Sequence, residues 1–143
     1  IDDPFGLVLA RRLVAEGREV IACTLHGANL GAVPGARVLH ADRLQAAPAG
    51  LRFNLVWAGH QADVNVRMVA PFNVSNLIAV AGALLARGVD FSSLAPVLSR
   101  LVPPQGRMQL VGGVCEPLVV VDYAHSPDAL AKVLEALVGH ALT

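Results

Sequence analysis

Apolar residues recur at helical or strand spacing along most of the chain, and glycine or proline separates the resulting elements. Residues 6–16 carry apolar side chains every three or four positions, which predicts a helix that stops at Gly17. The apolar run at residues 20–25 then predicts a short buried strand. Alternating strands and helices of this kind are typical of a parallel α/β layer.

The middle third of the chain predicts a small antiparallel sheet. Short strands are expected around residues 38–39 and 51–57, in a region where glycine, proline and alanine are frequent. Residues 63–69 alternate polar and apolar side chains, which is typical of a half-exposed strand.

The next segment predicts two helices. Residues 74–87 are almost purely apolar, so we expect a helix that is buried on all sides and ends at Gly88. A second helix is expected over residues 92–101, with a serine as its N-cap. The prolines at positions 103 and 104 then break the chain.

The last forty residues predict a hairpin and a helix. Residues 108–111 and 118–121 are expected to be strands joined by a turn at residues 112–113. Ser126 is a suitable N-cap for a helix over residues 127–138, because proline occupies the first helical position.

Composition narrows the class of protein. Hydrophobic residues make up 55% of the chain and charged residues 15%, which favours a folded core over disorder. The formal net charge of zero gives no reason to expect nucleic acid or an anionic membrane as a partner. No apolar run approaches the roughly 20 residues that span a bilayer. The two cysteines, Cys23 and Cys115, are too few for a disulfide framework, so we expect reduced thiols in the cytoplasm.

Asp122 and His125 are the first candidates for a binding site. Asp122 follows the apolar strand expected at residues 118–121, where a carboxylate needs solvent or hydrogen-bond partners such as ribose hydroxyls. His125 adjoins a helix amino end, where phosphate binds well. Alternatively, Asp122 bonds backbone amides in its own turn and His125 is simply exposed. A metal site formed with Asp128 is weakly indicated, and we predict none.

Two asparagines and an arginine are further candidates. Asn73 can cap its helix, which alone would explain it. Asn76 lies in the first turn of an apolar helix, and its amide offers the donor and acceptor that complement an adenine edge. Arg107, directly after the proline break, suits a phosphate or a carboxylate at a domain junction, although it can equally be a surface arginine.

Three segments carry a resemblance to the Mur ligases, closest to those of the MurE type. Residues 72–79 resemble the family phrase FNVSN-LLA, residues 104–108 resemble P-x-G-R-M, and residues 119–130 resemble VVVDYAHTPDAL, with Ser126 in place of threonine. Residues 2–4 resemble the end of the family's N-x-D-D-P strand. The resemblance covers essentially the whole chain.

The resemblance implies an enzyme that adds the third amino acid to a UDP-N-acetylmuramoyl dipeptide in peptidoglycan synthesis, with ATP and Mg²⁺, through an acyl phosphate. Its partners would be the UDP-muramoyl peptide and an amino acid, either diaminopimelate or lysine. Asn73 and Asn76 would lie against adenine and Arg107 at the nucleotide and domain junction. Asp122 and His125 would touch the ribose and nearby atoms. No catalytic residue is assigned.

The resemblance also implies an internal piece of a longer protein. The chain lacks the phosphate-binding motif G-x-x-x-x-G-K-[ST] and any lysine before Lys132, so the family's carbamoylated lysine is absent. Residues 1–103 would be the later part of the central ATP-binding domain, and residues 104–143 the start of the C-terminal domain.

The expected fold class is therefore α/β. It comprises part of a mostly parallel nucleotide-binding sheet, a small antiparallel sheet, and the start of a second, Rossmann-like α/β domain. The missing domains of the same protein would be partners. Two alternatives remain open: a non-catalytic nucleotide-binding module, and a fragment of a sister ligase, such as a MurF-type, folylpolyglutamate or cyanophycin synthetase.

Overall fold

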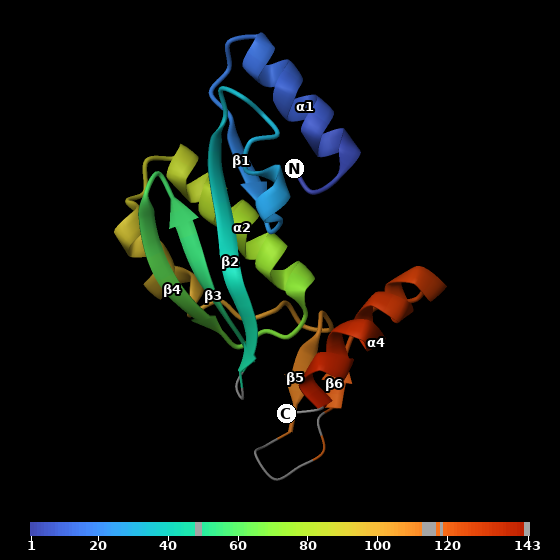
Figure 1. The fold of residues 1–143 in the computed structure, drawn as a ribbon. Helices are drawn as coiled ribbons and strands as arrows, with labels where there is room; N and C mark the ends of the chain where they lie inside the picture. Colours follow the sequence, from blue (N-terminus) through green and yellow to red (C-terminus); the bar gives the residue numbers. More distant parts are fainter. Residues whose placement is uncertain (48–49, 113–116, 118, 142–143) are drawn as a thin grey trace.

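The computed structural model describes residues 1–47, 50–112, 117 and 119–141. It confirms an α/β fold, with a larger sheet and a small antiparallel sheet (Figure 1). The elements are α1 (Pro4–Ala15), β1 (Ile21–Thr24), η1 (Gly27–Asn29), β2 (Arg37–Ala47), β3 (Gly50–Trp57), β4 (His60–Val66), α2 (Pro71–Ala86), η2 (Phe91–Ser93), α3 (Leu94–Leu98), β5 (Gln109–Val111), β6 (Val119–Val121) and α4 (Pro127–Ala141).

The larger sheet has the strand order β1-β2-β3-β4. The parallel part of the expected sheet is represented by the β1–β2 pair, and β2, β3 and β4 form the expected antiparallel meander. The meander is continuous with β1 rather than a separate sheet. β2 is an eleven-residue strand, much longer than the two residues expected, because it pairs with β1 on one edge and with β3 on the other.

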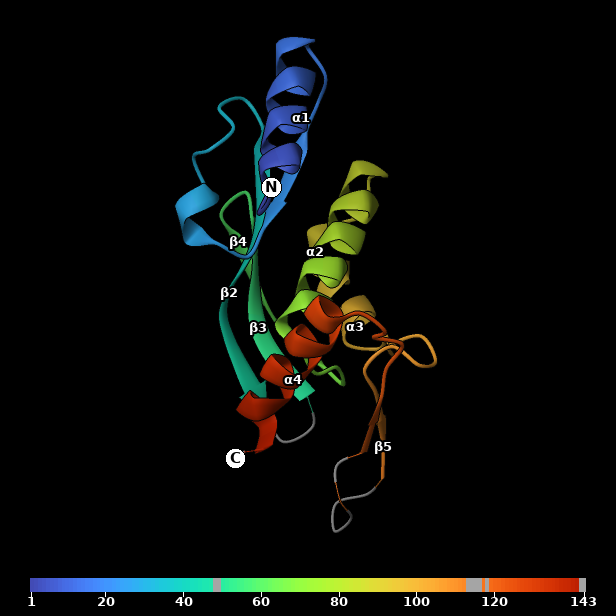
Figure 2. The same ribbon diagram turned by 90° about the vertical axis from the view of Figure 1, so that its right-hand side faces the viewer.

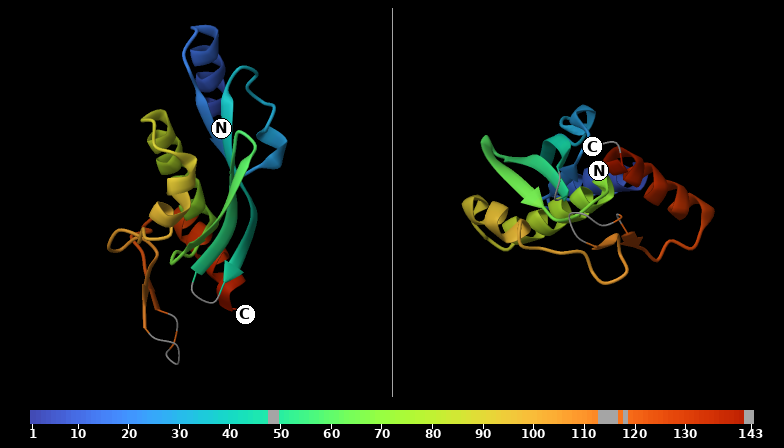
Figure 3. Two further views of the ribbon diagram at one scale, coloured as in Figure 1. Left: turned by 90° about the vertical axis from the view of Figure 1, so that its left-hand side faces the viewer. Right: turned by 90° about the horizontal axis from the view of Figure 1, so that it is seen from below.

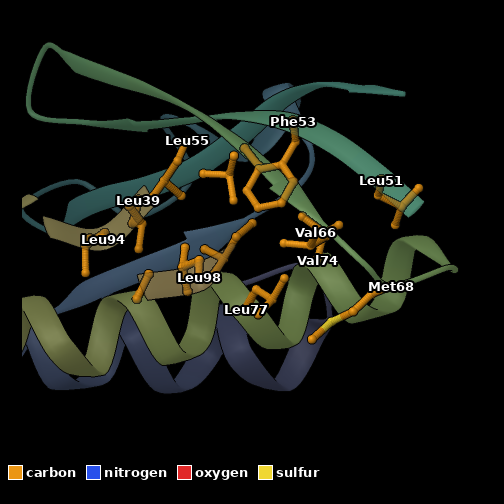
Figure 4. Close-up of a cluster of buried hydrophobic side chains, with 14 of the residues drawn as sticks. Leu39, Leu51, Phe53, Leu55, Val66, Met68, Val74, Leu77, Leu94 and Leu98 are labelled. Carbon is orange, nitrogen blue, oxygen red and sulfur yellow. The ribbon is translucent and has the colours of Figure 1, made fainter. Parts of the chain in front are cut away.

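The main core lies between this sheet and the helices α2 and α3, which cover one of its faces (Figures 2 and 4). Along β3 the residues at odd positions point into the core, including the fully buried Phe53 and Leu55. α2 contributes Val74, Leu77 and Ile78 from the opposite side. Burying one such side chain stabilises the fold by about 1.5–3 kcal/mol, so this contact holds α2 against the sheet.

α2 differs from its sequence-based expectation in two respects. It begins at Pro71, three residues early, because proline fits the first helical position. It is also not buried on all sides: Val80 is 43% exposed, and Ala79 and Ala83 face solvent. The second expected helix is shorter too, with only Leu94–Leu98 in α-helix and no side-chain cap bond from Ser93.

The backbone before α2 is strained. Ala70 is completely buried, yet its φ is +79° and its ψ 125°, a conformation that residues with a Cβ rarely adopt. It occupies the N-cap position and provides no side-chain cap bond.

The start of the chain is fixed to the end of β1 by Asp2. Its carboxylate accepts hydrogen bonds from the Leu25 amide (2.8 Å) and the Asn29 side chain (2.9 Å), and from the Thr24 hydroxyl. Burial by itself would raise the pKa of Asp2, but these three bonds, with nearby His26, lower it overall. Asp2 thus places α1, which begins two residues later and is capped by Asp3.

The C-terminal part consists of the β5–β6 hairpin and α4, and the hairpin lies outside the four-stranded sheet (Figure 3). Ser126 caps α4 as expected, accepting a bond from the Ala129 amide at 3.3 Å. The expectation that the strand at 118–121 is buried on both faces is wrong for its described residues. Val119 and Val121 are 49% and 45% exposed, because a two-stranded sheet leaves one face uncovered. Leu118, the Gly113 turn position and Cys115 fall outside the described residues.

The strain at Ala70 predicts an unusual result for an alanine-to-glycine substitution. Relief of the positive φ, worth about 1–3 kcal/mol, should offset the loss of one buried methyl group and the greater freedom of glycine in the unfolded chain. Ala81→Gly makes the same chemical change at a fully buried position inside α2, without strain to relieve. We therefore expect Ala70→Gly to be at least about 1 kcal/mol less destabilising than Ala81→Gly in urea unfolding. Equal losses would contradict the strained backbone.

Candidate functional site

Met108 connects the C-terminal hairpin to the amino end of α2. Its side chain is completely buried and forms a small second core with Val69 and Ala70, the residues just before α2. Val120 from β6 and Val133 from α4 pack against the same cluster. Met108 adopts φ +50°, a left-handed backbone conformation that is uncommon for a residue with a side chain. The start of α2 and the β5–β6 hairpin, near which the candidate residues lie, are therefore adjacent in space (Figure 1).

Asp122 holds this arrangement. Its Oδ2 accepts a hydrogen bond from the Met108 amide at 2.8 Å, and its Oδ1 accepts one from the Ala124 amide at 2.7 Å. The carboxylate is half-buried at the end of β6. The alternative in which Asp122 bonds backbone amides is thus observed, with one partner from its own turn and one from the residue just before β5. Each carboxylate oxygen retains a further lone pair that can accept another hydrogen bond.

Arg107 and His125 both contact the ring of Tyr123. The Arg107 guanidinium is 5.3 Å from the centre of the Tyr123 ring. The His125 ring meets the same ring edge-on, with 5.3 Å between centroids, and His125 Nδ1 is 3.0 Å from the Tyr123 carbonyl oxygen. Arg107 and His125 are both exposed, so both can reach a ligand.

The two asparagines lie near the start of α2, with Asn73 in its first turn and Asn76 in its second. Asn73 does not cap the helix, which corrects that expectation: it lies inside the first turn, and its Nδ2 donates to the Val69 carbonyl at 2.6 Å. Because the helix begins at Pro71, the cap position falls on Ala70 instead. Asn76 is exposed, and its side chain forms no hydrogen bond within the described residues. Its amide is free to meet a ligand.

The structure brings together Arg107, Asp122 and His125, and it places Asn73 against the residues that Met108 contacts. Among the hydrogen bonds and ion pairs of the described residues, none links the side chains of Asn73 or Asn76 to the other three. A bound molecule would have to bridge them. Sequence reasoning missed Met108 and Tyr123, although the apolar residue after Arg107 and the aromatic residue between Asp122 and His125 were both visible.

Neither a metal centre nor a membrane span emerges within the described ranges. Over residues 1–47, 50–112, 117 and 119–141 there is no group of three or more His, Cys, Asp or Glu side chains arranged to hold a metal ion. No helix in that part of the chain is both long enough and apolar enough to cross a bilayer.

Comparison with known protein families matches residues 106–141 to the model described as "Mur ligase, glutamate ligase domain". A curated relative, the UDP-N-acetylmuramoyl-L-alanyl-D-glutamate–2,6-diaminopimelate ligase of Xylella fastidiosa (strain 9a5c), is 43% identical over 141 residues. That alignment covers 98% of this chain but only 27% of the relative. The chain therefore spans about a quarter of the length of the curated relatives it matches.

Solved structures agree with this comparison. A structure of a UDP-N-acetylmuramoyl-L-alanyl-D-glutamate–2,6-diaminopimelate ligase superimposes with a TM-score of 0.63 and 29% identity, covering 93% of this chain and 31% of that one. MurF from Acinetobacter baumannii gives a TM-score of 0.63 at 17% identity, with 83% and 29% coverage. At that identity the second likeness shows a shared fold only.

The Asp122 bonds predict a local effect that requires no ligand. Asp122→Ala leaves the Met108 and Ala124 amides without their acceptor, so the free energy of unfolding should fall by about 1–2 kcal/mol and the Met108 amide should exchange faster. Asp128→Ala is the matched control. Its side chain is 80% exposed, and among the described residues it pairs with Lys132 alone, so the change should stay below about 0.5 kcal/mol. If residue-resolved hydrogen exchange shows that Asp122→Ala leaves the exchange rate of the Met108 amide unchanged, as in the Asp128→Ala control, the Asp122 bond does not hold Met108 in place.

Proposed function

Because the chain belongs to the Mur ligase family, we propose that it is an internal part of an ATP-dependent amide-bond ligase. The ligase would add the third amino acid to a UDP-N-acetylmuramoyl dipeptide in the cytoplasm, during peptidoglycan synthesis. The names of the curated relatives favour diaminopimelate over lysine as that amino acid. A non-catalytic nucleotide-binding module and a fragment of a sister ligase remain the competing proposals.

We infer that this chain supplies the side of the nucleotide site that faces the adenosine. The observation that carries the proposal is the contact of Met108 with Val69 and Ala70, because it places the Arg107–His125 cluster beside the amino end of α2. The available groups suit adenosine: the Asn76 amide is both donor and acceptor, and the Asp122 carboxylate is an acceptor for ribose hydroxyls. Asn73 supports the turn that presents Asn76.

The phosphate end of the nucleotide would be held elsewhere. ATP, when bound, supplies the phosphoryl group that activates the substrate carboxylate. This chain has no glycine-rich phosphate loop, so the triphosphate and Mg²⁺ would be held mainly by the parts of the ligase that precede it. Arg107 is the exposed cation at the junction, and it can approach the nucleotide from the C-terminal side.

We further propose that residues 1–103 are the later part of the ATP-binding domain and residues 104–143 the start of the next domain. The main core includes no described residue beyond Leu101, whereas the second cluster joins Met108 and α4 to Val69 and Ala70 across the boundary. Between them lie Pro103 and Pro104, and then Gly106 with φ +70°. The family model begins at residue 106, which supports the same division.

The free edge of β1 supports the view that an earlier strand completes the sheet. The Ile1 nitrogen donates to the Cys23 carbonyl at 2.7 Å, on the edge of β1 that faces away from β2. In a parallel ladder, a strand ending at Ile1 would also accept a bond from the Cys23 amide. It would then connect through α1 to β1 as a right-handed crossover. α1 carries exposed apolar side chains that such a strand would help to cover: Phe5 is 75% and Val8 65% exposed.

This sheet arrangement can be tested by extending the chain with the residues encoded before Ile1. We expect the Cys23 amide to exchange more slowly in the extended protein than in the 143-residue chain. The Ala22 amide is the internal control, because it faces β2 and should be protected equally in both. If the Cys23 amide exchanges equally fast in the two proteins, no strand adds at this edge.

Asn76→Ala tests the nucleotide assignment in the complete ligase. An adenine contact far from the reacting phosphorus contributes mostly uniform binding, so the Michaelis constant for ATP should rise roughly two- to tenfold while the turnover number changes less. Asn65→Ala, an exposed asparagine on β4, is the control and should leave both constants unchanged. A lower melting temperature with an unchanged Michaelis constant would instead make Asn76 structural.

A further inference from the structure

Tyr123 is a side chain that neither the sequence motifs nor the proposed nucleotide contacts explain. It follows Asp122 directly, and its ring is 67% exposed, which is unusual for a large aromatic side chain. Within the described residues no hydrogen bond is formed by its hydroxyl group, so its contacts are made by the ring.

Those contacts are with Arg107 and His125, the two exposed basic side chains of the candidate site. The Arg107 guanidinium lies 5.3 Å from the ring centre, within the range of a cation–π interaction. The His125 imidazole meets the ring edge-on at 5.3 Å and an interplanar angle of 66°, the arrangement that aromatic pairs prefer. The Tyr123 ring thus contacts both the Arg107 guanidinium and the His125 imidazole.

The strand register explains why these residues meet. β5 and β6 pair with Gln109 opposite Val121, so continuing two residues outward on each strand brings Arg107 opposite Tyr123. Arg107 comes from the segment after the proline break, and His125 from the turn before α4. Both are exposed. Among the described side chains only the Tyr123 ring contacts the Arg107 guanidinium, which would otherwise sample many rotamers, whereas His125 is also restrained through Nδ1 by the Tyr123 carbonyl.

We propose that Tyr123 is a positioning residue of the nucleotide site, whose ring holds Arg107 and His125 in converging orientations. The inference rests on the proposed function, since it assumes that these two side chains contact the nucleotide. Pre-ordering them lowers the entropy that a ligand must remove when it binds. The aromatic ring performs this task, and the hydroxyl group is dispensable.

The geometry can be tested first on the 143-residue chain without any ligand. Tyr123→Leu removes the aromatic face, and Tyr123→Phe is the matched control that keeps the ring and removes only the hydroxyl. In the wild type and in Tyr123→Phe, the Arg107 Nε–H and the His125 ring protons should show ring-current shifts in NMR spectra. Those shifts should disappear in Tyr123→Leu. Because Tyr123 is mostly exposed, both variants should fold.

The second measurement is steady-state kinetics of the complete ligase. A lost cation–π contact at an exposed site corresponds to about a two- to fivefold change in an equilibrium constant. We therefore expect Tyr123→Leu to raise the Michaelis constant for ATP by about two- to fivefold, with a smaller change in turnover number, and Tyr123→Phe to match the wild type. In an Arg107→Ala, His125→Ala background, Tyr123→Leu should add nothing further, because it acts through those two residues.

The outcomes separate this inference from the proposal beneath it. If Arg107→Ala raises the Michaelis constant and Tyr123→Leu does not, the nucleotide site stands and the positioning inference is overturned. If Tyr123→Phe is as impaired as Tyr123→Leu, the hydroxyl group is responsible and the inference is again overturned. If Arg107→Ala and His125→Ala have no effect on the Michaelis constant, the proposed site and the inference fail together.

Discussion

The left-handed backbone of Met108 determines how the two parts of this molecule meet. A non-glycine residue in this conformation is disfavoured by about 1–2 kcal/mol. Two interactions offset that cost: the complete burial of the Met108 side chain against Val69 and Ala70, and the bond from its amide to Asp122. Without this contact, the hairpin and α4 would have only a few residues with which to pack on the first part of the chain.

Strain is present on both sides of the same contact. Ala70 has φ +79° and Met108 has φ +50°, and the two are completely buried in one cluster. Strained backbone tends to persist at sites that fix a functional geometry, because the surrounding packing over-determines it. Here it fixes the start of α2, the hydrogen bond of Asn73 to Val69 and the approach of the hairpin. The exposed polar side chains of the site are therefore supported by an interior that is apolar and closely packed.

The sequence predicts the elements of the fold better than their contacts. The spacing of apolar residues located α1, β1, α2 and α4, because each carries a strong local pattern and a clear stop or cap. β2 was underestimated, since its alternation is interrupted by a bulge between Asp42 and Gln45 and its partners lie on two other strands. The start of α2 was misplaced because the expected cap, Asn73, competes with Pro71, which fits the first helical position.

The candidate site shows the same limit. Residue type and position were enough to single out Asp122 and His125, but not the Met108 amide, which lies just before β5, fourteen positions away. Such a partner depends on the strand register, which the hairpin turn and the buried faces of both strands set together, so the residues around Asp122 alone do not reveal it. The exposure of β6 and of one side of α2 was also unpredictable from apolar runs, because those runs show that a surface is apolar and not whether this chain covers it.

The most direct test is hydrogen exchange of the complete ligase with and without a non-hydrolysable ATP analogue. Our account predicts that the analogue protects two separate segments of this chain, the first turns of α2 and the residues from Arg107 through His125. Protection should extend to both together, because the proposed site joins them through the Met108 contact. Protection of only one segment, or of neither while the ligase binds the analogue, would contradict it.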